Sequence, residues 1–256
     1  MKNGLVIKTL ATIGFVLAIS PLIALLTKVP WNNFFLYLND FSAIKLSLWT
    51  SLLATIFALL FGVPIAWILA RSSSKVVAII RPLVLTPIVL PPTVTGIALL
   101  SLMGRRGLFG KYIYDATGWS IPFTSSAVVL TGIFVGMPFV VLICESNFRQ
   151  LPKEVEDAAV VDRVSAGELF KNIALPQSVS SIATAGVMAW ARAVGEFGAT
   201  LMFAGSLPGS TQTWTMLIYQ ELEINPESAY ALAAVMLFIA VILVVLLRNP
   251  LKNSFR

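Results

Sequence analysis

Long apolar runs separated by short polar segments are the main pattern along the chain. A helix of about 20 apolar residues is long enough to cross the hydrocarbon core of a bilayer. Six runs approach or exceed this length, over about residues 9–27, 44–70, 78–103, 124–145, 178–204 and 228–247. The pattern therefore predicts an all-α integral membrane protein with about six transmembrane helices, and we expect a single membrane domain over residues 1–256.

Composition agrees with this prediction and excludes several kinds of chemistry. Of the 256 residues, 57% are hydrophobic and only 12% are charged, whereas soluble domains carry roughly 25% charged residues. The chain has no histidine and one cysteine, Cys144, which excludes Ser-His and Cys-His pairs and Cys/His metal sites. It also lacks the G-x-x-x-x-G-K-[ST] loop that binds nucleotide phosphates. We therefore expect no catalytic residue, metal or cofactor on this chain.

The distribution of basic residues predicts the orientation. If both termini are cytoplasmic, 12 of the 18 Lys and Arg residues lie on the cytoplasmic side, five lie outside, and Arg192 lies within a span. Cytoplasmic loops carry an excess of Lys and Arg in membrane proteins, so this arrangement is favoured. The net charge of +6 is then a signal of topology, and no nucleic-acid partner is expected.

One polar stretch, residues 151–176, is unusually charged for so apolar a chain, with 8 charged positions out of 26. Glu156 and Asp157 fall in what would be the first turns of a helix, where carboxylates are favoured. Ser165 and Glu168 have the spacing of a capping box, which predicts a second short helix. We expect two short surface helices that meet at a bend, with Pro176 ending the second. The alternative is an ordinary solvated loop.

The third apolar run contains several prolines followed by small polar residues. Proline removes a backbone donor and kinks a helix, and in a membrane the freed carbonyls need protein or a water-filled cavity as partner. Pro82, Pro87, Pro91 and Pro92 are therefore expected to interrupt this span. The residues that could form a gate or a wall of a translocation pathway here are Pro91, Pro92, Thr93, Thr95 and Gly96. The alternative is a kinked structural helix packed by its neighbours.

The fifth apolar run holds two ionisable residues, Arg192 and Glu196, on one helical face. Ionisable residues at membrane depth usually face the interior of the helix bundle. Both residues could therefore line a translocation pathway. Alternatively the two residues form an ion pair that only holds the helices together.

Two short motifs in the charged stretch resemble a known family. Asp157-Ala158-Ala159, followed at a fixed distance by Ile173-Ala-Leu-Pro176, resembles the "EAA…G…I-x-LP" cytoplasmic loop of ABC importer permeases. In that family the loop forms coupling helices that sit in a cleft of the ATPase subunit. Arg163 stands where the family has glycine, and Gly167 would relocate the bend. The resemblance implies an ABC importer permease fold, with ATPase coupling through Glu156, Asp157, Ala158, Ala159, Arg163, Ser165, Gly167, Leu175 and Pro176.

Two further stretches resemble a narrower group of this family. Residues 81–110 and 190–213, which include the sequences GRRGLFG and ARAVGEFGA, look like the corresponding parts of molybdate or tungstate permeases. This resemblance implies a homodimer in the cell membrane of a prokaryote, surrounded by lipid, with two ATP-binding subunits that hold ATP and Mg and an external oxyanion-binding protein. A sulfate or thiosulfate permease is the nearest alternative, and an ion-coupled secondary transporter is a more distant one.

Overall fold

The computed structural model describes residues 2–38, 41–152 and 164–254, and within these ranges the regular secondary structure is entirely helical. The all-α prediction is therefore confirmed. In chain order the elements are α1 (Lys2–Thr27), η1 (Trp31–Leu38), α2 (Ser42–Arg71), α3 (Lys75–Leu85), η2 (Thr86–Ile88), α4 (Pro92–Met103), α5 (Gly110–Thr117), α6 (Ser125–Arg149), α8 (Ala166–Leu169), η3 (Phe170–Ala174), α9 (Leu175–Gln177), α10 (Val179–Val194), α11 (Gly198–Ala204), α12 (Trp214–Ile224) and α13 (Pro226–Ser254).

Four of the expected spans are single long apolar helices among the described residues. They are Leu5–Thr27, Ser42–Arg71, Ser125–Arg149 and Pro226–Val245. The third expected span consists of two helical segments, Lys75–Ile88 and Pro92–Met103, bent by 117°. The interruption follows Pro87 as predicted, but Pro82 lies inside α3 and does not break it. The fifth expected span is also divided, since α10 ends at Val194 and α11 begins at Gly198.

The chain forms two compact units. The larger comprises residues 42–215 and 246–256, and the smaller comprises residues 1–41 and 216–245. In the smaller unit Trp31 packs against Phe238, with ring centroids 6.5 Å apart. The Tyr37 hydroxyl donates a 2.6 Å hydrogen bond to Glu227. Whether the two units form one domain, as we expect from the sequence, stays a prediction.

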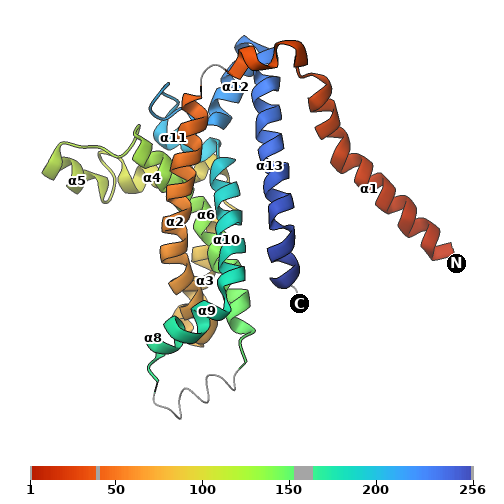
Figure 1. The fold of residues 1–256 in the computed structure, drawn as a ribbon. Helices are drawn as coiled ribbons and strands as arrows, with labels where there is room; N and C mark the ends of the chain where they lie inside the picture. Colours follow the sequence, from red (N-terminus) through yellow and green to blue (C-terminus); the bar gives the residue numbers. More distant parts are fainter. Residues whose placement is uncertain (1, 39–40, 153–163, 255–256) are drawn as a thin grey trace. The chain divides into compact units, whose positions relative to one another are not determined.

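The larger unit is built on three helices, α2, α6 and α10, that run side by side (Figure 1). Small residues let them approach closely. A Cβ atom added at Gly132 of α6 would lie 2.7 Å from the Cβ of Ala54 on α2, too close for two carbon atoms. The main core between these helices is therefore made mostly of small and β-branched side chains, with Leu69, Cys144 and Phe148 also fully buried.

A second core cluster lies where α4 and α11 meet the first half of α6. Its buried members are Leu99, Ala127, Val128, Phe203 and Ala204. This cluster holds the two broken spans, α3–α4 and α10–α11, against one continuous helix. It therefore positions the candidate pathway residues described below.

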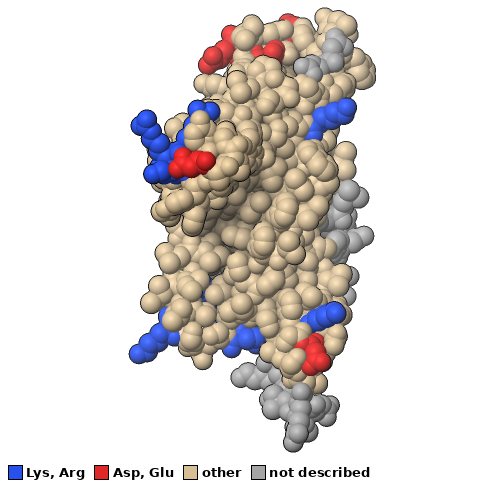
Figure 2. Space-filling view, turned by 90° about the vertical axis from the view of Figure 1, so that its left-hand side faces the viewer, with Lys and Arg blue, Asp and Glu red and all other residues tan. Residues whose placement is uncertain are grey.

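Charged side chains are unevenly distributed over the surface. Figure 2 shows Lys, Arg, Asp and Glu side chains in separate groups on the face it presents, with uncharged surface between the groups. Large apolar side chains are exposed along α2, among them Trp49, Ile56 and Phe61. A row of exposed apolar side chains along a helix is what a surface in contact with lipid or with another membrane subunit requires.

Candidate functional site

The two sequence stretches predicted to line a pathway come together where α4 packs on α11. A Cβ atom added at Gly96 would lie 2.5 Å from the Cβ of Met202 and 3.0 Å from the carbonyl oxygen of Ala199. A Cβ atom added at Gly198 would lie 2.8 Å from the Cβ of Pro92. Glycine is therefore required on both sides of this contact, because any side chain would push the helices apart.

Glu196 lies in the break between α10 and α11 and is 4% exposed. Its Oε1 accepts a 2.9 Å hydrogen bond from the backbone amide of Ala199, in the first turn of α11. Its Oε2 forms a 2.5 Å ion pair with Arg192 of α10, which is 33% exposed. Its carbonyl oxygen accepts a 2.9 Å hydrogen bond from the Thr215 hydroxyl. Glu196 thus satisfies donors on both sides of the break and neutralises Arg192.

The remaining predicted pathway residues divide by exposure. Thr95 and Gly96 are buried in the contact with α11, whereas Pro91, Pro92 and Thr93 are exposed. The Pro91 carbonyl accepts a 3.0 Å hydrogen bond from the Thr95 amide, so the first turn of α4 is regular. The structure therefore brings the two stretches together through Pro92, Gly96 and Gly198, while Thr93 is directed to the surface. Their role in a pathway stays a prediction.

We expect Gly96→Ala to destabilise the protein, although alanine normally favours a helix by about 1 kcal/mol over glycine. The added methyl group would meet Met202 and the Ala199 carbonyl, and such overpacking costs about 1–3 kcal/mol. The matched control is Gly14→Ala in α1, where an added Cβ meets nothing within 4 Å. Denaturant unfolding of the purified protein in mixed micelles measures both variants, and equal stability of the two would contradict the close contact.

The predicted ATPase-coupling residues fall partly outside the described residues. This applies to Glu156, Asp157, Ala158, Ala159 and Arg163. The capping box is confirmed, because the Ser165 hydroxyl accepts a 3.3 Å hydrogen bond from the Glu168 amide and the Ser165 amide donates a 2.9 Å hydrogen bond to the Glu168 carboxylate. The Ser165 hydroxyl also donates a 2.7 Å hydrogen bond to the Glu168 carboxylate. This bond and the one from the Ser165 amide lower the pKa of Glu168. Gly167 lies within α8, in open space.

The prediction that Pro176 ends this helical segment is wrong. The chain turns as a π-helix over η3, and α9 then runs from Leu175 to Gln177. Pro176 falls in the first turn of α9, where its missing amide donor is tolerated. Leu175 packs against the main core, while Pro176 is exposed.

An aromatic cluster ties the candidate coupling segment to the transmembrane helices. Phe170 of η3 lies 5.5 Å from Trp67 of α2 and 6.2 Å from Phe148 of α6, measured between ring centroids. Trp67 and Phe148 contact each other edge to face at 5.3 Å. A displacement of η3 would therefore act on the ends of α2 and α6 directly.

A second buried carboxylate, Glu145 of α6, is an ionisable residue within a span that was not among the predicted site residues. Arg81 of α3 and Arg149 of α6 both bind its Oε1, at 2.7 and 2.8 Å. The spacing of Glu145 and Arg149, four residues apart on a helix, signals a pair in the sequence. Arg81 carries no such signal because it is distant along the chain. Among the residues that the structure describes, no cluster of His, Cys, Asp and Glu is placed to hold a metal ion.

Comparison with known proteins assigns this chain to a family. The model of the family described as "Binding-protein-dependent transport system inner membrane component" matches residues 62–249. The "Molybdenum transport system permease protein ModB" of Mycobacterium tuberculosis is 39% identical over 251 residues, covering 96% of this chain and 95% of that protein. The "Probable transport system permease protein NifC" of Clostridium pasteurianum is 33% identical over 249 residues, covering 96% and 87%.

A solved structure shares the fold at low sequence identity. A chain of a bacterial alginate ABC transporter, crystallised with its pentasaccharide-bound periplasmic protein, superposes with a TM-score of 0.72 at 17% identity, covering 96% of this chain and 92% of that one. The family match and the two relatives cover most of the chain, including both broken spans and the capped segment. The chain therefore belongs to the inner membrane components of binding-protein-dependent transport systems, the permease subunits of ABC importers.

Proposed function

We propose that this chain forms the translocation pathway of an ATP-driven importer for a tetrahedral oxyanion, molybdate or tungstate. The observation that carries this proposal is the 39% identity to a molybdenum transport permease over 96% of the chain. The stretches around residues 81–110 and 190–213, which first resembled molybdate permeases, build the α4–α11 contact and the Glu196 break. A sulfate permease has no such support, and the family assignment speaks against an ion-coupled secondary transporter.

The proposed machine contains more than this chain. Two copies would form the pathway at their interface, and two ATP-binding subunits, which carry ATP and Mg, would dock at residues 151–176. An external oxyanion-binding protein would deliver the cargo. Both termini would be cytoplasmic, in the cell membrane of a prokaryote, as the Lys and Arg distribution favours. The row of exposed apolar side chains along α2 offers a surface for lipid or for the second copy.

The cluster of Phe170, Trp67 and Phe148 supports a coupling role for α8 and η3. Nucleotide-driven motion of an ATPase against α8 and η3 would reach α2 and α6 through Phe170, Trp67 and Phe148. Both helices pack on α10, whose C-terminal end carries the Arg192–Glu196 pair. We expect such motion to reach the candidate pathway through the aromatic cluster and the packing of α2 and α6 on α10.

Arg192 is proposed to attract the oxyanion, and Glu196 to keep that attraction weak. The guanidinium of Arg192 is partly exposed and is already paired with a buried carboxylate. A passing dianion would compete with that carboxylate for the same donors, so that it binds without being retained. A transport pathway needs this property, because a tightly held cargo leaves slowly.

Charge reversal in the docking segment tests the proposal. We expect the double variant Glu156→Lys, Asp157→Lys to lose co-purification with the partner ATPase, because both charges would meet the ATPase cleft with the opposite sign. The matched control is the double variant Glu221→Lys, Glu223→Lys, which reverses two carboxylates of α12, outside residues 151–176. An ATPase that still co-purifies with the first variant and is still stimulated normally would refute the coupling role.

The cargo is tested separately, by uptake into vesicles that contain the assembled importer. We expect molybdate and tungstate to be taken up with ATP and to compete with each other. A large excess of sulfate would leave their uptake unchanged. Strong competition by sulfate would instead favour the sulfate permease.

A further inference from the structure

A pocket of about 310 Å³ lies between the end of α2, the start of α3 and the end of α6. This volume is at the lower end of the range for small-molecule sites, roughly 300–1,000 Å³. Its polar lining consists of Arg71, Ser72, Ser73, Ser74, Arg81 and Arg149. None of these residues belongs to the α4–α11 contact or to the predicted coupling set. Among the described residues, those that line the pocket include no Asp or Glu.

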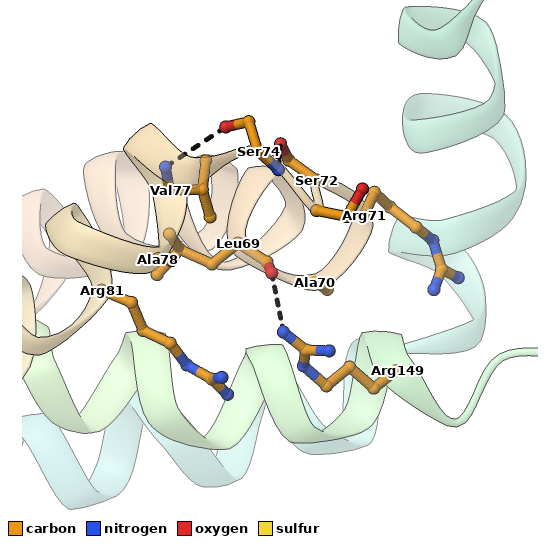
Figure 3. Close-up of a pocket in the computed structure, with 10 residues that line it drawn as sticks. Leu69, Ala70, Arg71, Ser72, Ser74, Val77, Ala78, Arg81 and Arg149 are labelled. Atoms are coloured by element: carbon orange, nitrogen blue, oxygen red, sulfur yellow. Dashed lines mark hydrogen bonds between the residues drawn. The ribbon is translucent and has the colours of Figure 1, made fainter.

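Two guanidinium groups are held in fixed positions beside this pocket. Arg81 and Arg149 share the Oε1 atom of Glu145, which is 2% exposed, and Arg149 also donates a 2.9 Å hydrogen bond to the Leu69 carbonyl at the end of α2. Nevertheless 43% of the Arg81 side chain and 45% of the Arg149 side chain stay exposed. Figure 3 shows both guanidinium groups in the space between α3 and α6, with Arg71 directed away from them.

Among the described residues, the charges of Arg81, Arg149 and Glu145 do not cancel. Arginine is always protonated in proteins, so Arg81 and Arg149 carry two positive charges against the single carboxylate of Glu145. One positive charge therefore remains within this group of three residues.

The turn between α2 and α3 adds neutral donors to the same pocket. Ser74 begins α3, and its hydroxyl accepts a 3.2 Å hydrogen bond from the Val77 amide (Figure 3). The Ser72 hydroxyl accepts a 3.3 Å hydrogen bond from the Ser74 amide, which orders the turn. The Ser73 side chain is exposed in this turn. The start of an 11-residue helix also presents amides without intrahelical partners and a partial positive charge.

We propose that this pocket binds a tetrahedral oxyanion, either free in solution or as the phosphate of a lipid headgroup. Guanidinium groups match such oxygens with paired N–H donors, and Arg81 and Arg149 are preorganised by Glu145. The serine turn and the start of α3 supply the opposite wall. This site is separate from the proposed pathway. An anion bound there would contact the ends of α2 and α6, next to the candidate coupling segment at residues 151–176.

The first experiment changes the charge of the pocket without breaking the Glu145 network. Ser73→Glu adds a carboxylate to the lining, and Ser73→Gln adds the same volume without charge. Binding of radiolabelled phosphate and of molybdate to the delipidated, full-length protein is measured by equilibrium dialysis. We expect Ser73→Glu to weaken binding about tenfold, as a like charge a few ångströms away does near a protein surface, and Ser73→Gln to change it less than twofold.

The second arm tests the lipid source. Native mass spectrometry is applied to the unsubstituted protein, Ser73→Glu and Ser73→Gln. It compares how much phosphatidic acid each protein retains with how much diacylglycerol of the same acyl chains it retains. Saturable binding of free anion that Ser73→Glu weakens assigns the site to a soluble oxyanion. Variant-sensitive retention of phosphatidic acid alone assigns it to a headgroup. The proposal is overturned if Ser73→Glu and Ser73→Gln behave alike in both arms. Neither arm requires the ATPase or uptake, so the result is independent of the proposed transport function.

Discussion

Glu145→Ala is expected to lower the free energy of unfolding by about 3 kcal/mol. Removing one partner of a buried ion pair costs about 3–5 kcal/mol, because the remaining charge is left without compensation. Here the remaining charges belong to Arg81 and Arg149, which bind the same carboxylate oxygen from two different helices. Both arginines are nearly half exposed, so water compensates in part, and we expect the lower end of that range.

Two further variants separate the contributions at Glu145. Glu145→Gln keeps an oxygen acceptor for Arg81 and Arg149, so we expect a smaller loss, about 1–2 kcal/mol. The exposed Glu223 provides the control, because Glu223→Ala should change stability by less than about 0.5 kcal/mol. Unfolding in mixed micelles measures all three variants. A Glu145→Ala protein as stable as the control would show that the arginines do not depend on this carboxylate.

Glu196→Ala is expected to cost about 2–3 kcal/mol, through the loss of two interactions at the break between α10 and α11. One is the acceptor for the Ala199 amide, which would be left buried without a partner. The other is the ion pair with Arg192, which is only partly buried and therefore contributes less. Glu196→Gln keeps the acceptor and should lose about half as much stability.

The same pair of variants has a distinct expected effect on transport. In Glu196→Gln the Arg192 charge is no longer neutralised, so the proposed oxyanion cargo should bind more tightly and leave more slowly. We expect the KM and the maximal rate of molybdate uptake both to fall severalfold. Arg192→Gln is the matched variant and should raise the KM. Uptake kinetics that change in neither variant would mean that the pair only holds the helices together.

Hydropathy alone was sufficient to locate the continuous spans. The runs at 9–27, 44–70, 124–145 and 228–247 each correspond to one helix, because a long apolar segment in lipid can satisfy its backbone only as a helix or a closed barrel. The capping box at Ser165 and Glu168 was also predictable. Its hydrogen bonds join residues three apart, so no distant part of the chain is needed.

The positions of prolines predicted the interruptions of the helices less well than hydropathy predicted the continuous spans. Pro64 and Pro138 lie inside the unbroken helices α2 and α6, and Pro82 lies inside α3. The break after η2 instead coincides with the consecutive residues Pro91 and Pro92, at the start of α4. Whether a proline ends a helix depends on what satisfies the freed carbonyl nearby, and the sequence does not state which neighbour that is.

The break at residues 195–197 and the Glu145 network could not be predicted for a related reason. Each depends on one buried carboxylate that meets donors from separate helices. Ala199 of α11 and Arg192 of α10 meet the Glu196 carboxylate, and Arg81 of α3 meets the Glu145 carboxylate of α6. A buried charge is tolerated only when such partners are in place, and the partners are set by how the helices pack.

By itself the sequence determined the fold class, the continuous spans and the local cap, because each follows from properties of consecutive residues: apolar length and short-range hydrogen bonds. Only the tertiary structure decided which prolines coincide with a break, that the fifth span is divided at residues 195–197, that Pro176 continues a helix, and which carboxylates hold the arginines. These features depend on whether a polar group in an apolar protein finds a partner, and that partner lies on another helix.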